Sequence, residues 1–184
     1  MRKSYNELRA EIALLFPDNA AGEITPADLR TFLLNTLEAT QPAYGSLTRA
    51  TLSGNIVANI TPPVKVTWQA AGDSDAAQTT SNFANGDITR SERGTSVINF
   101  NADMEAANGR FITFTLFKNG VATPWGITGN GGGAGNPVAV ALTAIDYADP
   151  AAVYDIRASS EVAAITVTLS NMAMIVQILP VNTY

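Results

Sequence analysis

The chain has 184 residues, of which 46% are hydrophobic and only 15% are charged, and its formal net charge is −5 at pH 7. It contains no cysteine and no histidine, which excludes disulfides, thiolate chemistry, and zinc sites or serine–histidine–aspartate triads in their ordinary form. Its lysines and arginines are few and scattered, so we expect no nucleic-acid partner.

The low content of charged residues suggests that part of the surface is covered in an assembly. Charged residues make up roughly 25% of an average globular protein. Interfaces between subunits lose charges at their cores, so burial between subunits would account for the deficit. No apolar run approaches the roughly 20 residues of a membrane span. Glu7 and Glu11 interrupt the region where a signal peptide would be apolar. We therefore expect no membrane partner, and folding in the cytoplasm.

Residues 1–40 predict two short amphipathic helices. A capping box at Ser4–Glu7 begins the first helix, and Pro17 stops it. Thr25–Asp28 begins the second helix, because threonine caps, proline suits the first helical position and aspartate favours the positive end of the dipole. The second helix ends at Gln41–Pro42. Such short helices are marginal alone in water, so their apolar faces must pack on each other, on the rest of the chain or on another chain.

The first part of the chain also carries a family resemblance. Leu15–Asn19 and Gly22–Arg30 resemble the leading segment of many tailed-phage structural proteins, fibres among them. In those proteins this segment precedes a β-rich outer domain. The resemblance implies that residues 1–43 are a helical anchoring segment that docks to a virion. The apolar residues expected to make that attachment are Leu8, Ile12, Phe16, Leu29, Phe32 and Leu33.

The stretch Asn108–Gly120 is the clearest strand signal in the sequence. Apolar and polar residues alternate over Phe111–Phe117, which places Ile112, Phe114 and Leu116 on one face. An Asn-Gly pair stands at each end and supplies the positive φ of a tight hairpin turn. The pattern predicts antiparallel β structure.

Further short strands bounded by turn residues are predicted along the rest of the chain. They cover residues 64–69, 85–90, 94–100, 121–123, 138–145, 152–158, 164–169 and 172–179. Residues 101–108 are expected to be a connection, and a long glycine-rich loop is expected from Pro124 to Asn136. No helical pattern falls between successive strands, which argues against a parallel α/β sheet. We therefore expect a mainly β protein, an antiparallel jelly-roll sandwich over residues 44–184 preceded by a short helical hairpin.

The central strand carries a second resemblance. Gly109–Phe114 and Leu116–Gly120 resemble the central strand pair of the jelly-roll family of tumour necrosis factor and the complement globular heads. That family has Gly-x-Tyr-x-Phe leading to Leu-x-x-Asn-Gly, and Phe111 stands where tyrosine is usual. The later segment Ala152–Leu179 also fits. The resemblance implies a compact homotrimer.

The last strand suits a place in such a trimer. Met172–Ile178 is apolar on both faces, as expected for a strand with one face in the core and the other against a neighbour. A strand that is fully buried inside one sandwich is the alternative. The residues assigned to the trimer interface are Phe111, Phe117, Met172, Met174 and Val176.

Together the two resemblances imply a phage virion structural protein, assembled in the host cytoplasm. The first hypothesis is a trimeric capsid decoration (cement) protein or head fibre, which docks on the major capsid protein by its N-terminal helices. The alternative is a short tail fibre, tail-tip or adaptor protein, which binds a tail protein and a host-surface receptor or glycan. Trp68, Trp125 and Tyr147 would then stack on the sugar.

Catalysis is not expected, nor is a metal or another cofactor. Paired carboxylates can hydrolyse glycosides without histidine. Each candidate pair lies in a predicted loop, where solvated acidic residues are the rule. The pairs are Asp73 with Asp75, Asp103 with Glu105, and Asp146 with Asp149.

Overall fold

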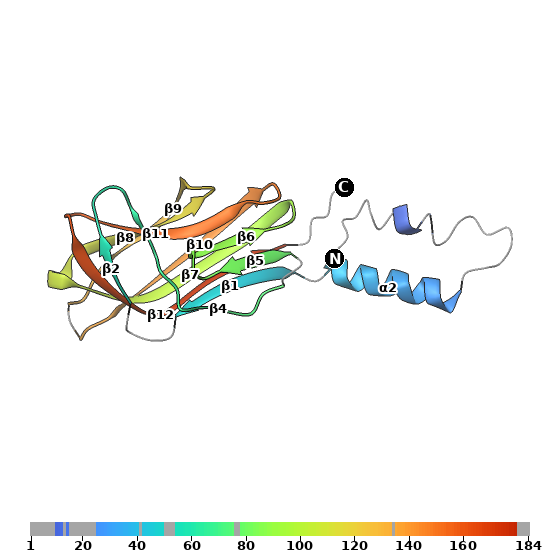
Figure 1. Cartoon of the computed structure of the whole chain (residues 1–184), viewed down its shortest axis with the longest axis horizontal. Coiled ribbons are helices and arrows are strands. Elements are labelled where there is room, and N and C mark those ends of the chain that lie inside the picture. The colour runs from blue at the N-terminus through green and yellow to red at the C-terminus, as the bar shows by residue number, and fades with distance from the viewer. Residues whose placement is uncertain are drawn as a thin grey trace.

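The computed structural model describes residues 10–12, 14, 25–40, 42–49, 54–75, 78–133 and 135–179. Figure 1 shows a β sandwich, with helix α2 (Pro26–Thr40) lying beyond the end at which the first strand begins. Residues 10–12 and 14 are helical, and the rest of the predicted first helix lies outside the described residues. No helix in the described part of the chain has the length and apolar character of a membrane span. The predicted mainly β sandwich is confirmed.

The first sheet has the strand order β10-β7-β12-β1-β4, and β2 also pairs with β12. Its strands are β1 (Ala43–Arg49), β2 (Gly54–Ala58), β4 (Ala70–Ala71), β7 (Gly94–Ala106), β10 (Val138–Ala148) and β12 (Ile165–Ile178). Every pairing in this sheet is antiparallel.

The second sheet has the strand order β5-β6-β11-β8-β9, and β3 also pairs with β11. Its strands are β3 (Val64–Lys65), β5 (Thr79–Asn82), β6 (Asp87–Arg90), β8 (Phe111–Lys118), β9 (Val121–Asn130) and β11 (Val153–Ser160). A short 3-10 helix, η1 (Ala107–Gly109), joins β7 to β8. From β6 to β12 successive strands cross between the sheets, apart from the β8–β9 hairpin, which is the connectivity of a jelly roll.

The hairpin of β8 and β9 forms as the sequence predicts. Ile112, Phe114 and Leu116 are all fully buried, so the predicted inward face of β8 is confirmed. Asn119 and Gly120 have φ angles of 52° and 77°, the positive pair that a tight two-residue hairpin turn requires. The Asn119 side chain also accepts a hydrogen bond from the backbone amide of Val153 at 2.8 Å, which ties the turn to β11.

Three strands, β7, β9 and β12, differ most from their predicted lengths. β7 continues through residues 101–106, which were expected to be a connection. β9 continues through Pro124 to Asn130, and proline is tolerated there because β9 is an edge strand. β12 joins the two strands predicted over 164–169 and 172–179. A register shift between Ser170 and Ala173 bends that strand without ending it, so it pairs with β2 and then with β1.

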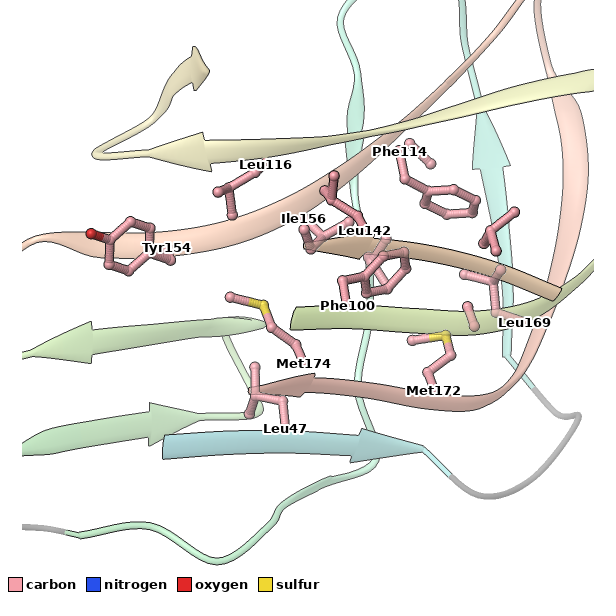
Figure 2. Packing of buried hydrophobic residues seen from close by; sticks show 14 of the residues in the cluster. Leu47, Phe100, Phe114, Leu116, Leu142, Tyr154, Ile156, Leu169, Met172 and Met174 are labelled. Carbon is pink, nitrogen blue, oxygen red and sulfur yellow. The ribbon is translucent and has the colours of Figure 1, made fainter. Parts of the chain in front are cut away.

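The hydrophobic core lies between the inward faces of the two sheets (Figure 2). The Phe100 ring is its centre, with centroids 5.3 Å from Phe114 and 6.4 Å from Trp68. All fully buried members of this cluster lie between Leu47 and Val176. Among the described side chains, this core therefore lies within the sandwich and includes no residue of α2.

Helix α2 begins with the predicted cap. The backbone amide of Asp28 donates to Thr25 Oγ1 at 3.2 Å, and Asp28 Oδ2 accepts from the backbone amide of Thr25 at 3.0 Å. This reciprocal pair satisfies two amides that the first helical turn leaves without partners. The hydrogen bonds from the side chain and backbone of Thr25 hold the pKa of Asp28 below its usual value. The helix ends at Thr40, just before the predicted stop.

Candidate assembly surfaces

The outer face of the first sheet is uncharged toward one end of four neighbouring strands. Its central row runs straight across the sheet, because Ile145 pairs with Val97, Val97 with Gln177, and Gln177 with Tyr44. Tyr147 lies in the next row on β10, and Ile175 lies in the row on the other side. We call this surface the neutral face and define it by Tyr44, Val97, Ile145, Tyr147, Ile175 and Gln177.

Large apolar side chains of the neutral face are open to water in the single chain. Ile145 is 61% exposed, Tyr147 58%, Tyr44 44% and Ile175 39%. Thr143 and Asn99, which share a row with Ile175, hydrogen-bond to each other at 2.9 Å and so do not add a charge. A contiguous exposed apolar surface of this kind usually marks a contact with another molecule.

The nearest outward-facing acidic residues on these strands lie toward the opposite end of the sheet. Asp103 pairs with Ala139 across the sheet and accepts a hydrogen bond from Asn171. Glu105 follows on the same strand and accepts a hydrogen bond from the backbone amide of Gly135, which ties down the glycine-rich loop. The neutral face is therefore bounded by charge at one end, as an interface core is bounded by a polar rim.

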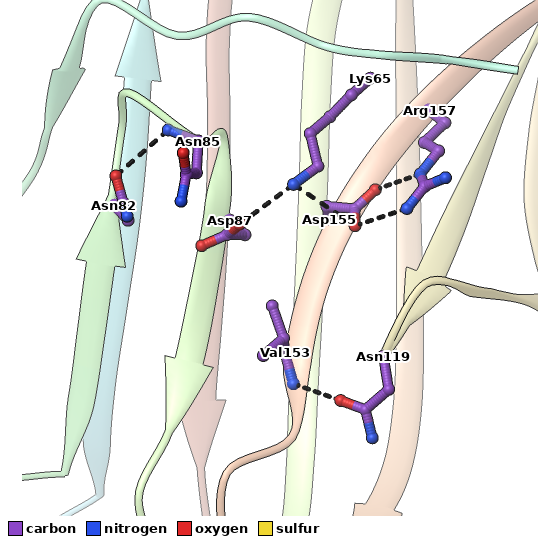
Figure 3. A network of polar contacts seen from close by, with 8 residues as sticks. All are labelled: Lys65, Asn82, Asn85, Asp87, Asn119, Val153, Asp155 and Arg157. Carbon is purple, nitrogen blue, oxygen red and sulfur yellow. Dashed lines mark hydrogen bonds and ion pairs between the residues drawn. The ribbon is translucent and has the colours of Figure 1, made fainter.

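The outer face of the second sheet is built from ion pairs. Lys65 Nζ lies 3.0 Å from Asp87 Oδ2 and 3.6 Å from Asp155 Oδ2. Arg157 donates to Asp155 through Nε at 2.7 Å and through Nη2 at 3.2 Å (Figure 3). The Asp155 side chain is only 3% exposed, so the two cations compensate a carboxylate that is largely removed from water. The hydrogen bond to Asp155 raises the pKa of Arg157.

Arg157 also covers the aromatic ring below it. Its guanidinium carbon lies 4.1 Å from the centroid of the Phe117 ring, which is a cation–π geometry. Phe117 keeps an exposed fraction of only 7% in consequence. The chain itself thus covers Phe117, whereas Phe111 at the start of the same strand stays half exposed.

A buried polar contact links the two sheets. Tyr154 on β11 donates from its hydroxyl to Asp146 Oδ2 on β10 at 2.7 Å, and Lys118 Nζ on β8 lies 2.8 Å from the same oxygen. Burial, and next the hydrogen bond to Asp146, raise the pKa of Tyr154 to about 12. Arg90 is fully buried at the same end of the sandwich and donates to the carbonyl of Gly94 and to Ser96 Oγ.

The predicted trimer interface is corrected for most of its residues. Met172, Met174 and Val176 point into the core and are all nearly or fully buried within their own subunit. Phe117 is covered by Arg157 of its own chain, as described above. When both faces of a strand are apolar, the sequence does not indicate which face turns inward. Phe111 is half exposed at the start of β8, and its role in a trimer stays a prediction.

The predicted attachment residues that the structure describes are on or beside α2. Leu29 and Leu33 are about half exposed, Phe32 is half-buried, and Ile12 is exposed. Leu8 and Phe16 lie outside the described residues. The structure of a single chain does not test contact with a capsid, so that role stays a prediction.

The aromatic residues considered for sugar stacking are not gathered in one place. Trp68 is buried in the core against Phe100, which removes it from any sugar site. Trp125 is half-buried and packs against the same core from β9. Tyr147 alone of the three has an open ring, and it belongs to the neutral face.

The carboxylate pairs considered for catalysis have ordinary partners where the structure gives them. Asp149 pairs with Arg93 at 2.7 Å, with both side chains well exposed. Asp146 is held by Tyr154 and Lys118. Among the described residues, no group of three or more acidic side chains is arranged to hold a metal ion.

Sequence reasoning missed the neutral face. Its residues come from strands that are far apart in the chain and meet only through sheet pairing. A usable signal was present in the alternation of residues 138–148, where small or apolar residues occupy both faces and the only charge is Asp146. The same holds for residues 171–178, which contain no charged residue.

Comparison with solved structures identifies the fold. The chain superposes on Eiger, a tumour necrosis factor of S. frugiperda, with a TM-score of 0.56 and 12% identity, over 76% of this chain and 94% of that one. Murine APRIL at pH 8.5 gives a TM-score of 0.55 and 8% identity, over 76% of this chain and 100% of that one. The globular domain of zebrafish complement 1qA protein gives a TM-score of 0.52 and 14% identity, over 76% of this chain and 97% of that one.

No protein-family model and no curated protein sequence matches the chain. Identities this low describe the fold alone. Residues from β1 to β12 therefore form a jelly-roll sandwich similar to those of tumour necrosis factor and complement 1q globular domains.

Proposed function

We propose that this chain is a structural protein of a tailed-phage virion: a homotrimeric capsid decoration (cement) protein or head fibre that displays the jelly roll outward. The neutral face is the observation that carries the proposal, because a surface protein that works as a monomer has no need of it. The resemblance of residues 15–30 to tailed-phage structural proteins supports the place of the protein in a virion.

The neutral face suits contact with copies of the same chain. Its exposed isoleucine and tyrosine side chains gain by removal from water, and no charge in its rows must be desolvated when it is covered. The outer face of the second sheet already satisfies its own charges, so it suits the surface of the assembly that stays in water. The family resemblance supplies the number of copies, which is three.

The N-terminal helical segment suits attachment to the major capsid protein. The buried core cluster of the described residues lies within the sandwich, and α2 lies beyond the end of the sandwich (Figure 1). A segment placed in this way can reach a neighbouring protein and leave the jelly roll free to project. The assembled protein would then be located in the virion, after assembly in the host cytoplasm.

Mass measurement in solution tests the trimer. We expect the wild-type chain to have three times its sequence mass and Ile145→Asp to have the mass of a single chain, because the substitution places a charge in the central row of the neutral face. Val121→Asp is the matched control, since Val121 is 69% exposed on β9 of the other sheet. A wild-type monomer, or equal loss of assembly in both variants, would contradict the trimer.

Binding to capsids tests the virion role. Capsids that lack the protein are mixed with the full chain or with a chain that lacks residues 1–41, and bound protein is counted after sedimentation. We expect many copies of the full chain per particle and none of the shortened chain, whose sandwich still forms a trimer by mass. A handful of copies located at the tail would favour the fibre alternative. If the full chain bound neither the capsid nor the tail, both virion roles would be overturned.

A further inference from the structure

Helix α2 has one covered side and one open side. On the covered side, Phe32 is half-buried and the Asn35 side chain donates a hydrogen bond to Glu11 Oε1 in the preceding helical turn. On the open side, Leu29 is 48% exposed and Leu33 and Leu34 are each 56% exposed. We call these three residues the leucine stripe. Leu29 and Leu33 are four positions apart, so they lie one above the other on the helix.

The leucine stripe needs a partner. A helix of this length is marginal alone in water and takes most of its stability from burial of an apolar face. Arg30 is the only charged residue between Leu29 and Asn35, and its long side chain can keep the guanidinium in water while its stem covers apolar surface.

The course of the chain indicates which helix that is. α2 ends at Thr40 and β1 begins at Ala43, so the helix is joined directly to a strand of the neutral face, where Tyr44 is the first outward side chain. Copies that meet through their neutral faces therefore have their α2 helices attached at the same end of the assembly. By symmetry those helices run parallel, and each presents the same stripe at the same height.

We infer that the leucine stripe is covered by the α2 helices of the other copies, so that the three helices form a parallel bundle that continues the neutral face. This inference rests on the trimer of the proposed function. It assigns Leu29 and Leu33 to contact between copies, and it leaves contact with the capsid to the remainder of the helical segment.

Cysteine substitution in the full chain tests the bundle, because the natural chain contains no cysteine. Leu33→Cys is treated with a short bismaleimide reagent, and the products are separated under denaturing conditions. We expect most chains to be linked in pairs, since equivalent residues in a parallel bundle lie close together. Thr31→Cys is the matched control: it is exposed on the same helix but about 200° around the axis from Leu33, and it should give little linkage.

Circular dichroism provides a second readout. We expect the double variant Leu29→Ser, Leu33→Ser to lose most of the helical signal while Thr31→Ser keeps it. Suppose that the protein is a trimer by mass but Leu33→Cys gives no linkage, or no more linkage than Thr31→Cys. That result would overturn this inference and leave the proposed function standing. A wild-type monomer would overturn both.

Discussion

The two outer faces of the sandwich differ in charge: one has paired charged residues and the other has an uncharged region. On the second sheet, Lys65, Asp87, Asp155 and Arg157 pair with one another, and Arg157 covers the Phe117 ring. On the first sheet, the neutral face has no charge in its central rows and leaves isoleucine and tyrosine open to water. The scarcity of charged residues is therefore most marked on one face of the sandwich, where large apolar side chains are open to water.

The same contrast exists between the two sides of β12. Met174 is fully buried in the core, whereas its neighbour Ile175 is 39% exposed on the neutral face. One residue position thus separates a side chain that is buried in the core from one that is open to water on the neutral face.

The largest expected effect tests that contrast. Met174→Ala should lower the free energy of unfolding by about 3 kcal/mol, because it leaves a cavity in the core. The mass of the assembly should not change. Denaturant unfolding at one fixed protein concentration measures the first quantity, and light scattering measures the second. Met174→Leu conserves volume and should cost less than about 1.5 kcal/mol. If Met174→Ala lowered the mass of the assembly without lowering the free energy of unfolding, the assignment of Met174 to the core of the subunit would be contradicted.

Removal of the buried carboxylate tests the ion-paired face. Asp155→Ala should destabilise the protein by about 2 kcal/mol, because Arg157 and Lys65 lose the carboxylate that both contact. Asp149→Ala is the control: its pair with Arg93 is exposed and should contribute less than about 0.5 kcal/mol. Urea unfolding of both variants gives the comparison. Equal effects would mean that the network adds nothing beyond a surface pair.

Alkaline titration tests the link between the sheets. The pKa of Tyr154 is raised to about 12 in the folded chain, above its ordinary value of 10.0. The unfolded state therefore loses this proton first, so stability is full below pH 10 and falls as pH rises toward 12, by at most about 1.4 kcal/mol per pH unit. Tyr154→Phe should be less stable at pH 7 but should show a smaller loss over that interval. If Tyr154→Phe lost stability between pH 10 and pH 12 as steeply as the wild type, the loss could not be assigned to Tyr154.

The smallest expected effect concerns the helical segment. Thr25→Ala removes the reciprocal cap, so the helical signal of α2 should decrease while the unfolding midpoint of the sandwich stays the same. The pKa of Asp28 is lowered from its ordinary value of 3.8, so the contribution of the cap is present above that pH and is lost as pH falls below it. Circular dichroism at pH 7 and pH 3 measures the effect of Thr25→Ala on the helical signal and the dependence of that signal on pH. A shift of the sandwich midpoint would show that the two parts are coupled.

The sequence predicted the elements whose signals are local. The cap at Thr25–Asp28 and the Asn119–Gly120 turn each depend on residues a few positions apart, and both formed as expected. The inward face of β8 was also predicted from the sequence, because its polar and apolar residues alternate. The predicted ends of β7, β9 and β12 were wrong, because pairing with a neighbouring strand extends a ladder through residues of weak propensity.

By itself, then, the sequence determined that the chain is an antiparallel sandwich preceded by a capped helix, and that it has too few charges to cover its surface evenly. Only the tertiary structure decided that Met174 turns inward and Ile175 outward, and that Ile145, Val97, Gln177 and Tyr44 stand in one row. The physical reason is register: those four residues come from strands distant in the chain, and only the pairing of β10, β7, β12 and β1 brings them together.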